Sequence, residues 1–191
     1  MSIKQIILAS ASPRRKLLFE KLNLNFIVEP SSYVEDMTLN LPPPELVKHL
    51  ALGKATDIAT KHQNAIIIGA DTIVVLNNKI YGKPKDRQDA INILSELNNT
   101  KHSVFTGFAI IDTDTQKTIT GAVESFVYFK NNTQDEIEKY VDADLPFDKA
   151  GAYAIQDPHF TLMEKMEGDH DNIIGLPLNE LRQSLQAFYG Q

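Results

Sequence analysis

Residues 65–76 (AIIIGADTIVVL) are the stretch that most limits how this chain can fold. Apolar residues occupy both alternating sets of positions, which predicts a central strand of a sheet, covered on both faces. Asp71 interrupts the run, and a carboxylate there costs free energy unless it is hydrogen-bonded, paired or bound to a metal. Asp71 could cap the local backbone at a bulge, or it could belong to a functional site. The second interpretation is favoured, because buried ionisable groups beside a cleft are over-represented at active sites.

Residues 3–16 (IKQIILASASPRRK) predict a short strand over residues 3–9 that turns directly into a helix. Ser12 is a typical N-cap residue, and Pro13 is a typical first helical residue. The dipole of a helix already makes this end positive, yet the first turn carries three cations: Arg14, Arg15 and Lys16. A bound anion would make the arrangement favourable, and a solvated basic turn is the alternative. The stretch lacks the glycines of a P-loop or a dinucleotide-binding motif.

Two further segments carry charged residues whose role the sequence leaves open. The apolar periodicity predicts a helix over residues 45–62, and Lys54 projects from within its apolar arc. Such a lysine either extends to the rim of the apolar surface or reaches an internal anion. The loop before this helix carries Glu35 and Asp36, which are either surface charges or residues that face the anion site through a metal.

The rest of the chain alternates strands and helices. Asn77-Asn78 predicts a two-residue hairpin turn. Residues 103–112 and 118–130 alternate apolar and polar side chains, which predicts an antiparallel pair of strands with one covered face. Residues 145–156 are rich in small and polar side chains and predict a loop that carries binding groups. Periodicity and capping predict strands over residues 26–29, 103–112, 118–130 and 160–166, and helices over residues 86–97, 133–141 and from about 172 onward.

The charge balance narrows the class of ligand. The chain has 191 residues and a formal net charge of −6, which argues against a general nucleic-acid binder, because such proteins are usually basic. A local basic cluster on an acidic protein suits a small anionic ligand better. The absence of cysteine excludes disulfides and thiolate metal sites. The N-terminal apolar run is too short for a signal peptide, and Asp71 breaks the longest apolar run, so we expect a soluble cytoplasmic protein without a membrane partner.

Five motifs occur in an order that resembles the Maf family of nucleoside triphosphate pyrophosphatases. They cover the chain nearly from end to end, and five ordered motifs are far more specific than any one of them. The motifs are LASASPRR at residues 8–15, GADT at 69–72, GKP at 82–84, DKAGAYAIQ at 148–156 and GLP at 175–177.

The resemblance implies a single domain over residues 1–191, with an α/β fold related to the inosine triphosphate pyrophosphatases. In such a fold a long mixed β-sheet floors a cleft between two α/β lobes. It also implies a cytoplasmic hydrolase that needs a divalent cation, Mg²⁺ or Mn²⁺, and splits a nucleoside triphosphate into the monophosphate and pyrophosphate. A homodimer is compatible with it, as is a role in restraining cell division.

The same resemblance implies roles for individual residues. Asp71 matches the general base, and Asp36 stands where the family usually has a glutamate, which makes it the expected metal ligand. Thr72 and Gln156 together resemble the branch that takes dTTP and UTP rather than 7-methyl-GTP. The expected triphosphate contacts are Ser10, Arg14, Arg15, Lys54 and Lys83.

The resemblance therefore implies a dTTP/UTP pyrophosphatase that cleans nucleotide pools, with modified pyrimidine nucleotides among its substrates. One alternative is a nucleotide-sensing regulator of cell division that binds without hydrolysis. Asp71 weighs against it, because a pure sensor has no need for a carboxylate that repels phosphate. Another alternative is a nucleic-acid-binding module. It is disfavoured, because the sequence lacks a basic stripe interleaved with aromatic residues.

Overall fold

The structure, a computed structural model, describes residues 4–189 and has a mixed α/β fold, as the sequence predicts. In the described part of the chain, a seven-stranded sheet has the order β2-β1-β3-β5-β6-β7, and β4 pairs with β3. β1 pairs in parallel with β2 and β3, whereas the β3–β4 and β6–β7 pairs are antiparallel. The strands are β1 (Gln5–Ala9), β2 (Phe26–Val28), β3 (Ala65–Leu76), β4 (Lys79–Tyr81), β5 (Lys101–Asp112), β6 (Thr118–Phe129) and β7 (Met163–Glu167).

The chain divides into two compact units, each assembled from separate stretches. The first contains residues 1–71, 106–123 and 175–191, and the second contains residues 72–105 and 124–174. The boundary falls inside β3, β5 and β6, so each of these strands contributes residues to both units. The single domain expected over residues 1–191 stays a prediction, and its first three and last two residues lie outside the described part.

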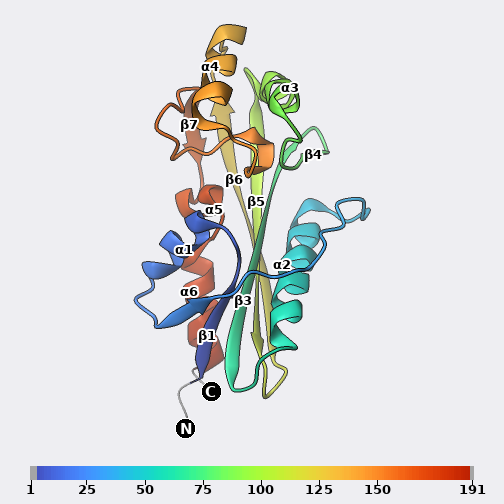
Figure 1. Ribbon diagram of the computed structural model, residues 1–191, viewed down its shortest axis with the longest axis vertical. Helices are drawn as coiled ribbons and strands as arrows, with labels where there is room; N and C mark the ends of the chain where they lie inside the picture. Colours follow the sequence, from blue (N-terminus) through green and yellow to red (C-terminus); the bar gives the residue numbers. More distant parts are fainter. Residues whose placement is uncertain (1–3, 190–191) are drawn as a thin grey trace. The chain divides into compact units, whose positions relative to one another are not determined.

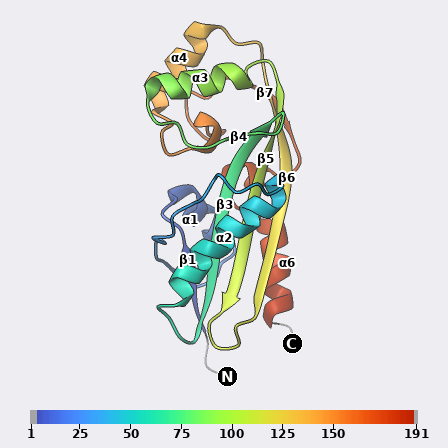
Figure 2. The same ribbon diagram turned by 90° about the vertical axis from the view of Figure 1, so that its right-hand side faces the viewer.

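In the first unit, three helices cover the strands (Figures 1 and 2). α2 (Pro43–Ala59) lies on one face, where its buried alanines pack against β1 and β3. α1 (Pro13–Glu20) and α6 (Leu178–Tyr189) lie on the other face. α2 begins two residues before the predicted start, because proline fits the first turn of a helix.

The predicted junction of β1 and α1 is confirmed. Pro13 is the first residue of α1, and the Ser12 hydroxyl accepts a hydrogen bond from the Arg15 amide at 3.4 Å. The start of the strand predicted at Ile3 lies outside the described residues. This capped start leaves the basic residues in the first turn of the helix.

β5 differs from the prediction of one covered face. It is buried at every position from Val104 to Asp112, including Thr106, which is fully buried. The physical reason is that helices cover both faces of the sheet in the first unit: Ala109 and Ile111 of β5 pack with α2 on one face, and α1 and α6 lie on the other. In β6, buried residues alternate with partly buried ones from Ser125 to Phe129, and the residues before Ser125 are partly or fully exposed.

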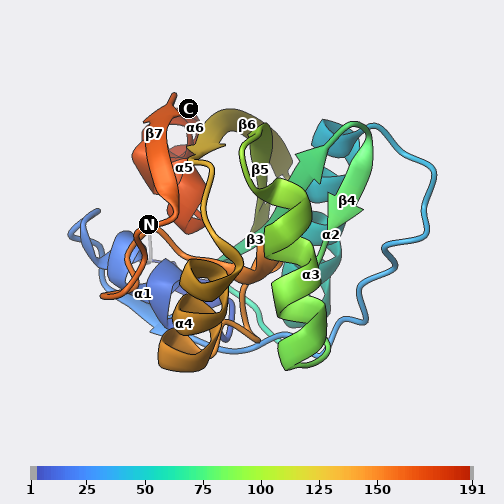
Figure 3. The ribbon, with the colours of Figure 1, turned by 90° about the horizontal axis from the view of Figure 1, so that it is seen from above.

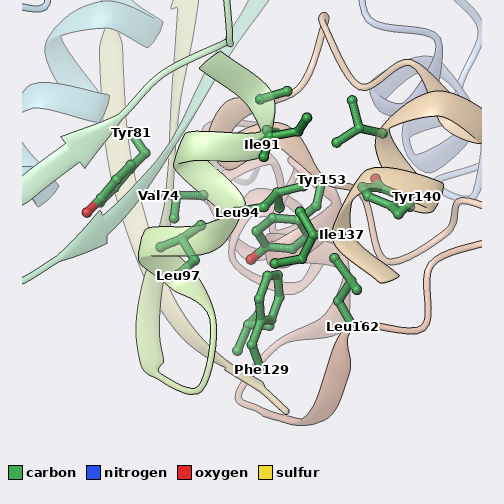
Figure 4. Packing of buried hydrophobic residues seen from close by; sticks show 14 of the residues in the cluster. Val74, Tyr81, Ile91, Leu94, Leu97, Phe129, Ile137, Tyr140, Tyr153 and Leu162 are labelled. Carbon is green, nitrogen blue, oxygen red and sulfur yellow. The ribbon is translucent and has the colours of Figure 1, made fainter. Parts of the chain in front are cut away.

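In the second unit, helices and the chain after α4 enclose an apolar core. α3 (Arg87–Leu97) lies beside α4 (Gln134–Asp144), as Figure 3 shows, and both contribute buried side chains to the cluster in Figure 4. The predicted capping box at the start of α4 is present: the Thr133 hydroxyl accepts a hydrogen bond from the Glu136 amide, and the Glu136 carboxylate accepts one from the Thr133 amide. The predicted hairpin turn is also confirmed, with Asn77 and Asn78 at positive φ.

The C-terminal region contains an element that the sequence pattern did not separate. A short helix, α5 (His170–Ile174), precedes α6, and Gly175 at φ 124° ends it. The inward residues predicted for the last helix are buried, among them Leu181 and Leu185. Between residues 4 and 189, no helix combines the length and the apolar character that a membrane span requires.

Candidate active site

Asp71 lies in the middle of β3 and is 5% exposed. The Lys54 ammonium of α2 donates a hydrogen bond to its Oδ1 and also lies 2.7 Å from Glu35 Oε1. One lysine therefore joins two carboxylates from separate segments. Burial is the largest influence on the Asp71 carboxyl and raises its pKa, while the positive charges of Lys54 and Arg15 act in the opposite direction.

Arg15 reaches the same group of residues from α1. Its Nε donates a hydrogen bond to the Gly175 carbonyl at 2.8 Å, which ties the start of α1 to the segment before α6. Burial lowers the pKa of Arg15, and the negative charges of Asp71 and Glu35 oppose that effect. A guanidinium has so high a pKa that it stays charged. The first unit thus brings two cations and two carboxylates together.

The predicted anion site at the start of α1 has the expected polar groups. Ser10 follows β1 and is 5% exposed, and its hydroxyl accepts a hydrogen bond from the Ser12 amide at 3.2 Å. Arg14 is partly buried in the first turn. Hydroxyls, guanidinium groups and helical N–H groups in one place are the chemistry that binds phosphate.

The structure favours Glu35 over Asp36 as the acidic residue of this group. The Asp36 carboxylate accepts hydrogen bonds from the Thr38 amide at 2.9 Å and the Thr38 hydroxyl at 2.6 Å. These bonds lower the pKa of Asp36 and direct its carboxylate into the local turn. Glu35 instead meets Lys54. The family resemblance had made Asp36 the expected metal ligand; that role stays a prediction, and the residue that the structure brings to Lys54 is its neighbour Glu35.

The remaining predicted residues, Thr72, Lys83 and Gln156, belong to the second unit. Thr72 is partly buried in β3, and Lys83 and Gln156 are exposed. The second unit brings two of the five motifs into contact, because the Gly151 amide donates a hydrogen bond to the Gly82 carbonyl at 3.0 Å. Gly151 has φ 69°, and a side chain there would also collide with Val74, so this approach requires glycine.

The two carboxylates at Lys54 fit a hard divalent cation. Between residues 4 and 189, no group of three or more histidine, aspartate or glutamate side chains is placed to hold a metal ion. Mg²⁺ is commonly held by only one or two carboxylates and completes its shell with water and substrate phosphates. Glu35 and Asp71 already share one cation, the Lys54 ammonium, and their oxygen donors suit Mg²⁺ or Mn²⁺.

Comparison with known proteins agrees with the five motifs. Residues 5–188 match the family model of the Maf-like proteins. A protein of Dictyoglomus turgidum named dTTP/UTP pyrophosphatase is 46% identical over 97% of this chain and 96% of its own length. Proteins of the same name from Desulforamulus reducens and Acetivibrio thermocellus are each 43% identical, and the alignments cover at least 95% of each chain.

Among solved structures, the Staphylococcus aureus Ham1 protein aligns with 96% of this chain and 99% of its own, at 13% identity and a TM-score of 0.49. That likeness is too weak to bear on the fold or the activity. The family model and the relatives, in contrast, span almost the whole sequence at identities above 40%. The chain belongs to the Maf-like protein family.

Proposed function

We propose that this protein hydrolyses dTTP and UTP to the nucleoside monophosphate and pyrophosphate. The observation that carries the proposal is the buried Asp71 carboxylate in the middle of a covered strand, which is paired with Lys54 and is also stabilised in its ionised form by the positive charge of Arg15. The relatives named dTTP/UTP pyrophosphatase support it, because they match nearly the full length of the chain. Such a reaction removes triphosphates from the nucleotide pool.

We assign the binding of the triphosphate to the cations and the hydroxyl of the anion site. Guanidinium groups make strong charge-assisted bonds to phosphate oxygens, and a lysine adds a mobile point charge. The negative charge of the substrate also reverses the unfavourable placement of cations at the start of α1. The residues with this role are Ser10, Arg14, Arg15, Lys54 and Lys83.

Asp71 is the general base of the proposed reaction. Its carboxylate takes a proton from a water molecule, whose oxygen forms a bond to the α-phosphorus. The bond between the α-phosphorus and the bridging oxygen to the β-phosphate breaks, and pyrophosphate leaves with the electron pair. Lys54 and Arg15 favour the ionised carboxylate, which must be unprotonated to act as a base. Once the substrate binds, the same cations neutralise the triphosphate.

Glu35, with Asp71 beside it, would hold the divalent cation, Mg²⁺ or Mn²⁺. When bound, such a cation polarises the phosphoryl oxygens and neutralises charge on the leaving pyrophosphate. We prefer Glu35 to Asp36 because Glu35 contacts Lys54, whereas the carboxylate of Asp36 is bound to Thr38. A cytoplasmic location, a homodimer and a role in cell division are further parts of the proposal, and the last two rest on the family resemblance alone.

We assign the choice of base to Thr72 and Gln156. A glutamine amide offers a donor and an acceptor together and can match the O4 and N3–H groups that thymine and uracil share. Cytosine presents the reverse pattern, and a purine is larger. A non-hydrolysing sensor would bind the same nucleotides, but it has no use for a buried carboxylate among phosphate-binding cations.

The test is a panel of dTTP, UTP, CTP, GTP and 7-methyl-GTP with Mg²⁺ or Mn²⁺, with pyrophosphate release measured for each. We expect kcat/KM to be highest for dTTP and UTP. Binding of dTTP without release of pyrophosphate would instead favour the sensor. Turnover of 7-methyl-GTP at least equal to that of dTTP would contradict the assignment of substrate while leaving the reaction class in place.

A further inference from the structure

The loop between β2 and α2 is fastened to α2 by one aspartate. Asp57 Oδ2 accepts hydrogen bonds from the Ser31 hydroxyl at 2.8 Å and from the Ser32 amide at 2.7 Å. The Ser32 hydroxyl lies 3.2 Å from the same oxygen, and the Ser31 hydroxyl also accepts from the Tyr33 amide at 3.0 Å. These bonds lower the pKa of Asp57 to about 2, so its carboxylate is ionised at neutral pH.

Tyr33 occupies space that a glycine leaves on the same helix. A Cβ at Gly53 would come within 2.4 Å of the Tyr33 ring. Gly53 lies within α2, where alanine is a better helix former, and its φ is outside the left-handed region. The need for glycine here is therefore a need for space, and the tyrosine ring fills that space.

The contacts follow one stripe of α2. His49, Gly53 and Asp57 are spaced four residues apart and share a face of the helix. The Tyr33 hydroxyl lies 3.4 Å from His49 Nε2, which extends the contact along the stripe. Lys54 follows Gly53 directly, so the residue that binds Asp71 is next to the place where the loop is fastened.

Two residues beyond Tyr33, the same loop delivers Glu35 to Lys54, with 2.7 Å between Oε1 and Nζ. Val34, between them, is 86% exposed and anchors nothing in the described structure. The position of Glu35 thus depends on the contacts just before it. From these contacts we infer that Gly53 and Asp57 are positioning residues that hold Glu35 at Lys54 and Asp71. The inference rests on the proposed function of Glu35 in hydrolysis.

The experiment compares Gly53→Ala and Asp57→Asn in two backgrounds, the parent protein and Glu35→Gln. Gly53→Ala displaces the Tyr33 ring, and Asp57→Asn removes the charge that holds both serines. Two quantities are measured: kcat for dTTP, and the Kd for Mn²⁺ followed by electron paramagnetic resonance with a non-hydrolysable dTTP analogue. Thr56→Ala is the matched control, because it also raises helix propensity in α2 at an exposed position. Thermal melting of each variant confirms folding.

In the parent background we expect each positioning variant to lower kcat by about 10- to 100-fold and to weaken Mn²⁺ binding, with KM for dTTP nearly unchanged. In the Glu35→Gln background we expect the same substitutions to change kcat and the Kd for Mn²⁺ by less than about twofold, because the carboxylate that they position is already absent. Thr56→Ala should match the parent in both.

Effects that persist in full in the Glu35→Gln background, in either quantity, would overturn the inference. So would unchanged kcat and Mn²⁺ affinity in both positioning variants. If the parent protein released no pyrophosphate, the proposed function would fail, yet the Mn²⁺ measurements would still decide whether the two residues act through Glu35. If Glu35→Gln matched the parent in both quantities, Glu35 would have no role, and the positioning inference would fail with it.

Discussion

Asp71 shows how one residue can be identified from its surroundings in the sequence. A carboxylate inside a run of β-branched residues needs a compensating partner, and the structure supplies one in Lys54. The sequence alone left that partner open, because a lysine in an apolar helical arc more often extends to the surface. The buried pair resolves that choice in favour of an internal contact.

Replacement of Asp71 by asparagine keeps the shape of the side chain and removes the base. We expect kcat for dTTP to fall by about 10²- to 10⁴-fold, which is the usual contribution of a positioned general base. The Kd for a non-hydrolysable dTTP analogue should change little, because the phosphate contacts remain. Steady-state kinetics and calorimetric titration measure the two quantities. A variant that turns over dTTP at the parent rate would show that another group takes the proton.

His102 is a buried histidine outside the proposed chemistry. It is 2% exposed, its Nε2 lies 2.8 Å from the Tyr153 hydroxyl, and burial lowers its pKa to about 4. The unfolded chain therefore takes up this proton near pH 6.5 and the folded protein only near pH 4. Acidification between these values favours unfolding, and stability rises with pH across the same window.

We expect His102→Gln to remove that part of the pH dependence. Between pH 7 and pH 5, the parent should lose about 2 kcal/mol more of its free energy of unfolding than the variant loses. Urea unfolding at the two pH values measures the difference. Parallel losses in the two proteins would contradict the assignment of a neutral, buried His102.

At the scale of elements, features that depend on neighbouring residues could be predicted from the sequence. Features that depend on residues far away in the chain could not. The starts of α1 and α4 were predictable, because Ser12 and Thr133 bond to amides three residues ahead. The burial of β5 on both faces was not, because it depends on helices from distant parts of the chain that pack on the two faces of the sheet. The position of Glu35 likewise depends on Gly53 and Asp57, which follow much later in the chain.

The first turn of α1 offers a test with a control in the same turn. Arg14→Ala should weaken binding of a dTTP analogue by about 10- to 100-fold, the loss of a charge-assisted phosphate contact. Without nucleotide its melting temperature should be unchanged or slightly higher, because a cation is removed from the positive end of the helix dipole. Lys16→Ala is the control, because it removes the same charge from an exposed residue of the same turn, whose Nζ lies 4.0 Å from Glu20 Oε1. Equal losses of affinity in both variants would indicate a general charge effect and no specific anion site.

At the scale of the whole molecule, the chain has a formal net charge of −6, and its small group of cations at the proposed site suits a small anion. The choice among nucleotides then depends on the base. We expect Gln156→Glu to lower kcat/KM for UTP relative to CTP by about 10- to 100-fold, because a carboxylate cannot donate to O4 but can accept from the cytosine amine. Competition assays with both nucleotides measure the ratio, and an unchanged ratio would contradict the role of Gln156.

In the proposed reaction, water attacks the α-phosphorus of the nucleotide. Hydrolysis of dTTP in ¹⁸O-labelled water, followed by ³¹P nuclear magnetic resonance, locates the oxygen that the reaction adds. We expect dTMP that carries one ¹⁸O at its phosphorus and pyrophosphate that carries none. Label in the pyrophosphate would place the attack at the β-phosphorus, and release of labelled orthophosphate with dTDP would place it at the γ-phosphorus. Either result would contradict attack at the α-phosphorus.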